Sequence, residues 1–239
     1  SSIKSLMCCG SPLTPALKAD IMARLAPQLV ELYGLTEGLI TTLDPEDVEG
    51  RLASVGKPLI GTDLLILDDQ DQVCPAGVPG EIVGRGRIVM AEYNRRSDAN
   101  AEATWTDPAG RRWLRTGDVG KLDEDGFLYL VDRKKDLIIS GGQNIYPADI
   151  ETVLLEHPDV LEVAVIGVDS ERWGESPLAV VVLEHSEADT AAIMSWTNER
   201  VGKQQRVAGV VSINELPRNP NGTVLKRELR DMYRGRLSE

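Results

Sequence analysis

Five consecutive charged residues, Asp132 to Asp136, separate two apolar segments of this 239-residue chain. The apolar residues come before it at 127–131 and after it at 137–139. A fully charged segment between two strands cannot lie in a core, so it predicts a surface turn or an inter-domain linker. The length of the chain also allows more than one core. We therefore expect two domains, one over residues 1–132 and a smaller one over residues 133–239.

The part before the charged segment shows two patterns. Apolar residues that recur every four positions predict a helix within residues 13–30, and a short strand follows over 31–38. Residues 50–131 instead alternate short apolar runs with turn clusters. Such spacing predicts a small β-barrel or sandwich, except over the irregular stretch 85–110.

The part after the charged segment has a compact α+β pattern. We expect strands at 137–139, 160–168 and 178–183, a loop over Gly141–Asn144, and helices from Pro147, over 187–201 and over 224–236. The predicted fold class is thus a mixture of α/β and α+β. It comprises the end of a large N-terminal domain, with a small β-barrel subdomain at about 50–131, and then a small C-terminal α+β domain.

The net charge of −12 argues against a non-specific nucleic-acid binder. The charge is uneven, because residues 200–239 contain nine Lys and Arg against four Asp and Glu. A basic segment on an acidic protein suits a polyanion such as a nucleotide or CoA, while a solvated helix face explains it equally well. No apolar run approaches the roughly 20 residues that span a bilayer, so we expect no transmembrane segment.

The cysteines and histidines indicate the redox compartment and argue against a disulfide framework and a histidine-based metal site. Cys8, Cys9 and Cys74 form no CxxC pair, and their odd number argues against a disulfide framework. This usage favours a reducing compartment, and we expect a cytoplasmic protein. His157 and His185 are far apart and lack ligand motifs around them, which argues against a metal site built on them.

Two short motifs place polar groups that suit a nucleotide. Tyr33 to Glu37 reads Tyr-Gly-Leu-Thr-Glu, which offers an aromatic face, a hydroxyl and a carboxylate for a base, a phosphate and a divalent cation. Asp118 ends the segment Arg-Thr-Gly-Asp, and a carboxylate can accept hydrogen bonds from both hydroxyls of a ribose. Each motif alone is weak, because an ordinary turn or an Asx turn explains it as well.

A longer run, from Gly126 to Pro147, resembles the hinge region of the adenylate-forming superfamily, which contains acyl- and aryl-CoA ligases, peptide-synthetase adenylation domains and luciferases. Five further segments match this superfamily in order: Gly10-Ser11-Pro12, the Tyr-Gly-x-Thr-Glu segment, Val55-Gly56-Lys57-Pro58, the Thr-Gly-Asp segment and Pro217-Arg218-Asn219-Pro220-Asn221-Gly222. The resemblance covers the whole chain. Its Ser-Gly-Gly-Gln-Asn and Tyr-Pro segments are similar to the acyl-CoA synthetase branch rather than the peptide-synthetase branch.

The resemblance implies a site for ATP or AMP with Mg²⁺. The residues that would contact the nucleotide are Gly10, Ser11, Pro12, Tyr33, Gly34, Thr36, Asp118 and Arg133. Among them, Gly10–Pro12 and Tyr33 would enclose the adenine, and Asp118 would hold the ribose hydroxyls with Arg133 nearby. Thr36 would hydrogen-bond the phosphates. Glu37 would bind Mg²⁺, which prefers oxygen ligands.

The resemblance also implies roles for the second domain. Lys135 matches the hinge position, about which the small domain would rotate between two half-reactions. The residues that would line the CoA channel are Gly141, Gly142, Gln143 and Asn144, where paired glycines allow close backbone approach. Thr223 stands where the family has a catalytic Lys. Lys226 could reach back to that place only if its helix began elsewhere.

The implied activity is that of an acid–thiol ligase in fatty acid metabolism, which converts a carboxylic acid, ATP and CoA into acyl-CoA, AMP and pyrophosphate through an acyl-adenylate. The expected partners are these small molecules and no nucleic acid. The sequence leaves open whether the protein forms a homodimer. The family's glycine-rich phosphate loop does not occur in the sequence, so we expect a ligase fragment that is inactive alone. A non-catalytic nucleotide-binding relative and an adenylation domain serving a carrier protein remain as alternatives.

Overall fold

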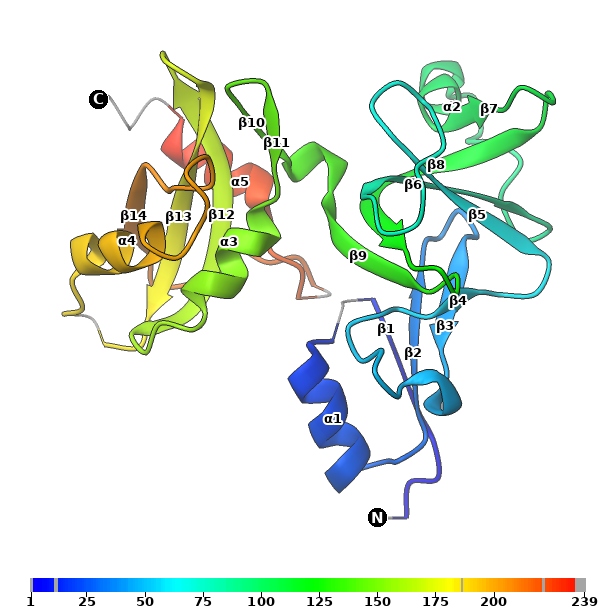
Figure 1. Ribbon diagram of the computed structural model, residues 1–239, viewed down its shortest axis with the longest axis horizontal. Coiled ribbons are helices and arrows are strands. Elements are labelled where there is room, and N and C mark those ends of the chain that lie inside the picture. Colours follow the sequence, from blue (N-terminus) through cyan, green and yellow to red (C-terminus); the bar gives the residue numbers. More distant parts are fainter. Residues whose placement is uncertain (1, 11–12, 186, 221, 235–239) are drawn as a thin grey trace. The chain divides into compact units, whose positions relative to one another are not determined.

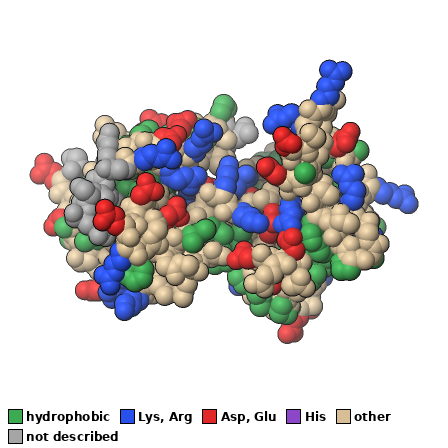
Figure 2. Space-filling view, turned by 90° about the horizontal axis from the view of Figure 1, so that it is seen from above, with side chains coloured by type: hydrophobic (Ala, Val, Ile, Leu, Met, Phe, Trp, Pro, Cys, Tyr) green, Lys and Arg blue, Asp and Glu red, His purple; other side chains and the backbone are tan. Residues whose placement is uncertain are grey.

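The computed structural model describes residues 2–10, 13–185, 187–220 and 222–234. The chain divides into two units, Ser1–Val131 and Asp132–Glu239 (Figure 1). The sequence places the domain boundary one residue later, between residues 132 and 133. Acidic and basic side chains lie interspersed on the face that Figure 2 presents. Within the described ranges, no helix is long and apolar enough to cross a membrane.

The first unit opens with a four-stranded sheet in the order β1-β2-β3-β4. Strand β1 (Leu6–Cys9) runs parallel to β2 (Leu29–Gly34), and helix α1 (Pro15–Arg24) connects them. Strands β3 (Ile40–Leu43) and β4 (Lys57–Pro58) are antiparallel to their neighbours. Strand β1 therefore ends beside the middle of β2. The Tyr-Gly-Leu-Thr-Glu segment begins at the end of β2 and continues beyond it.

Helix α1 is shorter than the predicted range of 13–30. Thr14 caps its N-terminus with a side chain that accepts a hydrogen bond from the backbone N–H of Leu17, and the helix ends at Arg24. Strand β2 already begins at Leu29, because its backbone pairs there with Leu6 of β1. The end of the predicted helix is therefore strand, and the strand expected at 31–38 starts earlier and ends at Gly34.

The second sheet of this unit has the order β5-β6-β8-β7, and β9 also pairs with β8. Its strands are β5 (Thr62–Leu67), β6 (Gly80–Gly86), β7 (Thr104–Thr106), β8 (Arg112–Leu122) and β9 (Leu128–Arg133). The stretch 85–110, expected to be irregular, contains α2 (Ser97–Glu102) and β7, while the short helix η1 (Pro45–Asp47) precedes β4. One apolar cluster joins both sheets through Leu39, Val55, Leu64, Ile66, Ile82 and Leu128.

The second unit is a five-stranded sheet with helices on both faces. Its strands are β10 (Ile138–Ser140), β11 (Gln143–Ile145), β12 (Val160–Ser170), β13 (Gly174–Leu183) and β14 (Gly209–Ser212). Its helices are η2 (Lys134–Asp136), α3 (Pro147–Leu154), α4 (Thr190–Asn198) and α5 (Lys226–Tyr233). Alternate residues of β12 and β13 pack against α3 and α4 on one face and against α5 on the other.

Two predictions for the second unit are wrong. Asp136 belongs to the charged segment but is buried, because Arg230 of α5 binds its carboxylate at 2.8 Å. Gln143 and Asn144 were expected in a loop, yet they lie on β11, where Asn144 pairs with Ile139 of β10. The hairpin turn between these strands is only Gly141 and Gly142 wide, and both glycines have positive φ angles.

Candidate functional site: a nucleotide-binding surface

A bulge in β8 sets the position of Asp118. Val83 pairs with Arg115, and Glu81 pairs with Val119, so Ile82 alone faces three residues of β8. Gly117 within this bulge has a φ of 70°, a conformation that glycine adopts without strain. Bulges re-aim side chains next to a ladder, and here the Asp118 side chain is carried to β2.

Tyr33 and Asp118 meet across the two sheets of the first unit. The Tyr33 hydroxyl donates a hydrogen bond of 2.7 Å to Oδ2 of Asp118, which is only 5% exposed. The Asp118 backbone N–H donates to the Thr116 hydroxyl at 3.0 Å, and that hydroxyl donates to the carbonyl of Ile82 at 2.9 Å. The carboxylate predicted to bind ribose and the aromatic ring predicted to contact adenine are thus neighbours.

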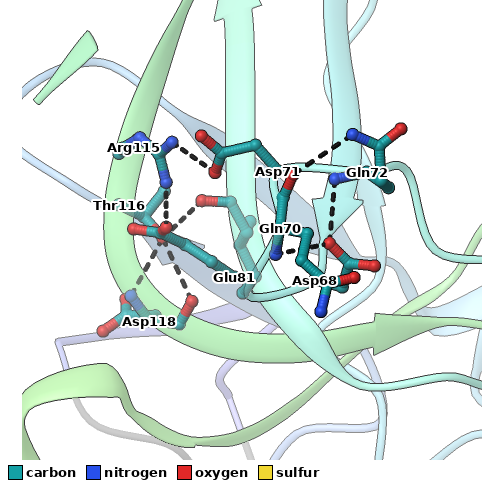
Figure 3. A network of polar contacts seen from close by, with 9 residues as sticks. Asp68, Gln70, Asp71, Gln72, Glu81, Arg115, Thr116 and Asp118 are labelled. Atoms are coloured by element: carbon teal, nitrogen blue, oxygen red, sulfur yellow. Dashed lines mark hydrogen bonds and ion pairs between the residues drawn. The ribbon is translucent and has the colours of Figure 1, made fainter. Parts of the chain in front are cut away.

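Arg115, which precedes the bulge, is held by two carboxylates. Its guanidinium lies 2.5 Å from Oε2 of Glu81 and 2.5 Å from Oδ1 of Asp71, as Figure 3 shows beside Thr116 and Asp118. A planar guanidinium bound on two sides has little freedom to turn. These ion pairs therefore fix the strand from which Asp118 projects.

Glu37 is held by two hydroxyls. Thr36 donates to its Oε2 at 2.9 Å, and Tyr93 donates to its Oε1 at 2.7 Å. The hydrogen bond from Tyr93 is the main cause that holds the pKa of Glu37 below its ordinary value, and the same bond raises the pKa of Tyr93. Glu37 therefore presents an ionised carboxylate with defined orientation.

Tyr93 is a residue that the sequence reasoning missed. The side chain of Asn100 fixes the backbone of Tyr93. Its Oδ1 accepts from the Tyr93 N–H at 2.6 Å, and its Nδ2 donates to the Tyr93 carbonyl at 3.0 Å. Nearby, a Cβ at Gly38 would lie 1.8 Å from the carbonyl oxygen of Ile88, so only glycine fits there. In the sequence, Tyr93 is marked only as an aromatic residue in a polar, irregular stretch. Such residues are too common to indicate a functional role.

A cavity of about 400 Å³ lies between Tyr93 and the bulge. Its lining consists of Glu81, Tyr93, Arg96, Ala99, Glu102, Ala103, Arg115, Thr116 and Gly117. Tyr93, which binds the Glu37 carboxylate, and Thr116, which accepts from the Asp118 backbone N–H, thus line one hollow in the first unit. Among the described residues, no three His, Cys, Asp or Glu side chains cluster into an all-protein metal site.

The loop that precedes α1 starts beside Tyr33. Cys9, the last residue of β1, pairs with Leu32, so Gly10 follows next to Tyr33. Gly10 has a φ of 95°, which lets the chain turn away from the sheet. Ser11 and Pro12 lie outside the described residues. On β2, a Cβ at Gly34 would lie 2.7 Å from the carbonyl of Leu39, so the close approach of β3 requires glycine.

The predicted hinge residues lie at the start of the second unit. Arg133, Lys134 and Lys135 are exposed, and Lys135 belongs to the short helix η2. Asp132 accepts a hydrogen bond of 3.0 Å from the backbone N–H of Ala148 in the first turn of α3. Because Tyr146 makes no side-chain cap there, Asp132 caps α3 from outside the helix.

The predicted channel residues form one end of the hairpin β10–β11. Gly141 donates its backbone N–H to the carbonyl of Trp173 at 2.8 Å, and a Cβ on Gly141 would lie 3.0 Å from the indole ring. Gln143 and Asn144 are exposed, and Trp173 remains 47% exposed. Trp173 is a second residue that sequence reasoning missed, since it lies 32 positions from Gly141 along the chain.

Thr223 lies in an exposed turn. Its backbone N–H donates to Oδ1 of Asn219 at 2.9 Å, and Gly222 before it has a φ of 85°. Lys226 begins α5 and binds Oε1 of Glu151 at 2.8 Å. Glu151 also accepts from the backbone N–H of Val165, so Lys226 serves an ion pair inside the second unit.

Comparison with known proteins identifies the family. Residues 1–94 match the family described as AMP-binding enzyme, and residues 149–223 match the AMP-binding enzyme C-terminal domain. The chain belongs to the AMP-binding enzymes. These are the adenylate-forming superfamily that the motifs indicate, and the two matches follow each other in the order of that fold.

Known AMP-binding enzymes extend the comparison. The chain is 45% identical to 2-succinylbenzoate–CoA ligase of Geobacillus kaustophilus over 84% of this chain and 40% of that one. It is 38% identical to the long-chain-fatty-acid–CoA ligase FadD13 of Mycobacterium tuberculosis over 94% and 44%. The structure of o-succinylbenzoate CoA synthetase (MenE) from Bacillus subtilis with ATP and magnesium ion matches with 38% identity and a TM-score of 0.81, over 96% of this chain and 47% of that one. The chain thus spans less than half the length of these relatives.

Proposed function

We propose that the chain is the C-terminal portion of an ATP-dependent acyl-CoA ligase, which joins a carboxylic acid to CoA through an acyl-adenylate. The hydrogen bond between Tyr33 and Asp118 is the observation that carries the proposal, because it brings two proposed adenosine contacts from separate sheets to one place. The similarity to relatives named as CoA ligases supports the same reaction class.

Adenosine recognition is assigned to the first unit. Tyr33 and the segment 10–12 would enclose the adenine. Asp118 would accept hydrogen bonds from the ribose hydroxyls, since the fixed and buried carboxylate has its orientation set before the nucleotide arrives. Gly34, where a Cβ would meet the Leu39 carbonyl and Ile40, places no side chain directly after Tyr33.

The phosphates and Mg²⁺ are assigned to Thr36 and Glu37. The Glu37 carboxylate fits the ion, because Mg²⁺ binds through one or two carboxylates together with substrate phosphates rather than in an all-protein cage. Its lowered pKa keeps the oxygens ionised at neutral pH. The ion would neutralise charge on the phosphates. The hydroxyl of Thr36 would orient a phosphate oxygen beside it.

The second unit would serve both half-reactions by rotating about Lys135. In one arrangement the turn at Thr223 would face the nucleotide. In the other, Gly141 to Asn144 would line the channel for the CoA thiol, and Trp173, whose exposed ring covers Gly141, would add an apolar wall. Arg133, at the end of β9, would approach the ribose in one of these states.

A non-catalytic nucleotide-binding relative is the second candidate function. Thr223 favours it, because a hydroxyl cannot supply the positive charge that stabilises an α-phosphate and a carboxylate during adenylation. The pairing of Lys226 with Glu151 strengthens this candidate, since the nearest downstream cation is already engaged.

Pyrophosphate–ATP exchange with the complete gene product separates these functions. Exchange that depends on an added acid supports the ligase, and a panel should include aryl and long-chain acids because both substrate classes occur among the relatives' names. AMP binding without exchange supports the non-catalytic relative. Transfer of the acyl group to a carrier protein in preference to CoA would instead support an adenylation domain. The 239-residue chain by itself is expected to show no exchange, since its sequence holds no phosphate loop.

A further inference from the structure

A buried ion pair joins helix α1 to strand β2 in the first unit. The Lys18 ammonium of α1 and the Glu31 carboxylate of β2 form a salt bridge in which the side chains are 2% and 3% exposed. Lys18 is the one buried residue of α1, while the apolar side chains of Leu17 and Leu25 are 46% and 42% exposed. The helix is therefore attached to the sheet by a cation rather than by an apolar stripe.

The pair connects the segments that flank the proposed adenine site. Oε1 of Glu31 accepts a hydrogen bond of 2.9 Å from the backbone N–H of Leu13, the residue directly after segment 10–12. Glu31 lies two residues before Tyr33 on β2. One carboxylate thus joins Leu13 to the strand that carries the aromatic ring.

Lys18 carries the connection further. Its ammonium donates to the carbonyl oxygen of Ser54 at 2.8 Å, and the Ser54 hydroxyl donates to the carbonyl of Leu128 at 2.8 Å. Gly56 also donates its N–H to the Ser54 hydroxyl. The ammonium therefore has a carbonyl and a carboxylate as partners, which a buried cation requires.

Stability alone does not account for such a pair. Removing two charges from water is costly, and well-packed apolar residues of similar volume often stabilise a core as well or better. The geometry instead fixes the distance between Leu13 and strand β2. Because Lys18 holds the Glu31 carboxylate in one orientation, that carboxylate accepts the Leu13 N–H in one place only.

We propose that Glu31 is a positioning residue for nucleotide binding, which holds Leu13 at a set distance from the strand that carries Tyr33, and that Lys18 fixes the Glu31 carboxylate. The inference rests on the proposed function of the first unit as an adenosine site. It assigns the effect to the hydrogen bond that Leu13 donates, with the ion pair as its support.

Two double variants of the complete gene product differ only in that acceptor. Lys18→Met/Glu31→Gln removes both charges and keeps an amide oxygen for the Leu13 N–H. Lys18→Met/Glu31→Leu removes the charges and the acceptor, and Lys18→Met/Glu31→Met replaces it if the leucine variant does not fold. The dissociation constant of AMP and the melting temperature are measured for each. Asp107→Asn is the matched control, a buried carboxylate of the same unit that binds Trp113 and Arg111 instead.

The glutamine variant is expected to bind AMP like the unaltered protein. The leucine or methionine variant is expected to raise the dissociation constant about tenfold, equal to about 1.4 kcal/mol, with a melting temperature similar to that of the glutamine variant. The Asp107→Asn control is expected to lower the melting temperature without changing AMP affinity. Equal AMP affinity in both double variants, whether retained or lost, would overturn the assignment to the Leu13 bond. An unaltered protein that binds no AMP would instead overturn the proposed function.

Discussion

The Tyr33 hydroxyl donates a 2.7 Å hydrogen bond to the Asp118 carboxylate, although 85 positions separate the two residues. Replacing Tyr33 by Phe removes the donor and leaves the buried carboxylate with one partner fewer. We expect the free energy of unfolding to fall by about 1.5–3 kcal/mol, the usual contribution of a hydrogen bond to a charged group. Denaturant unfolding of the variant measures it.

A matched control comes from a second tyrosine of the same unit. Tyr129 donates to Asp123 at a longer distance of 3.2 Å, so Tyr129→Phe should cost less stability than Tyr33→Phe. The Michaelis constant for ATP in the exchange assay should rise for Tyr33→Phe and stay unchanged for Tyr129→Phe. Equal effects of the two variants on ATP would contradict the role assigned to Tyr33.

Tyr93→Phe should change the pH dependence of Mg²⁺ binding. The hydrogen bond from Tyr93 lowers the pKa of Glu37, so its removal raises that pKa toward the ordinary value. Because the ionised carboxylate binds the cation, Mg²⁺ affinity should be lost at a higher pH in the variant as the solution is acidified. Mg²⁺ titrations of the exchange reaction across mildly acidic pH measure the midpoint. Identical midpoints in the variant and in the unaltered protein would show that Glu37 is not the ligand.

Thr223→Lys should raise the rate of adenylate formation by about 10²–10³, which is what one preorganised charge contact contributes. The substituted side chain has room, because the turn is exposed and nothing lies within 4 Å of a Cβ at Gly222 beside it. Thioester formation from preformed acyl-adenylate should stay nearly unchanged, since a different face of the small domain serves that step. Pyrophosphate exchange and single-turnover thioester assays measure the two rates.

Lys226→Met provides the comparison for that experiment. Because Lys226 pairs with Glu151, its loss should lower the stability of the second unit and leave the exchange rate as it was. An exchange rate that collapses in Lys226→Met, together with no gain in Thr223→Lys, would mean that Lys226 supplies the missing charge.

Trypsin should cut first at the junction of the two units. Arg133, Lys134 and Lys135 are exposed consecutive cleavage points at the end of β9. Arg172, exposed between β12 and β13, is the one Lys or Arg within residues 147–183 of the small domain. Mass spectrometry of the first fragments identifies the bond that is cut. An initial cut at Arg172 with the junction intact would argue against two separately folding domains.

The sequence predicted the local elements and could not predict their long-range pairs. The strand predicted at 160–168, which is β12, and the start of α3 at Pro147 followed from period and turn chemistry, which are local. The burial of Lys18 was unforeseen, because it depends on a carboxylate that arrives on another element. Asp136 was placed at the surface for the same reason, since its partner Arg230 comes 94 positions later.

The site residues divide in the same way. Tyr33, Glu37 and Asp118 could be named from short motifs, because each sits in a recognisable run. Tyr93 and Trp173 could not, since their importance comes from contacts with Glu37 and Gly141 that the order of residues does not encode.

The cap that Asp132 places on α3 has a consequence for the motion proposed about Lys135. Asp132 and Ala148 lie on opposite sides of that pivot in the chain, so a swing there would part them and leave an amide of the helix uncapped. Losing a cap costs about 1 kcal/mol, which changes the ratio of two populations about fivefold. In the proposed motion, Asp132 would therefore favour the state in which α3 stays capped. The preference is small enough for the binding energy of a substrate to exceed it.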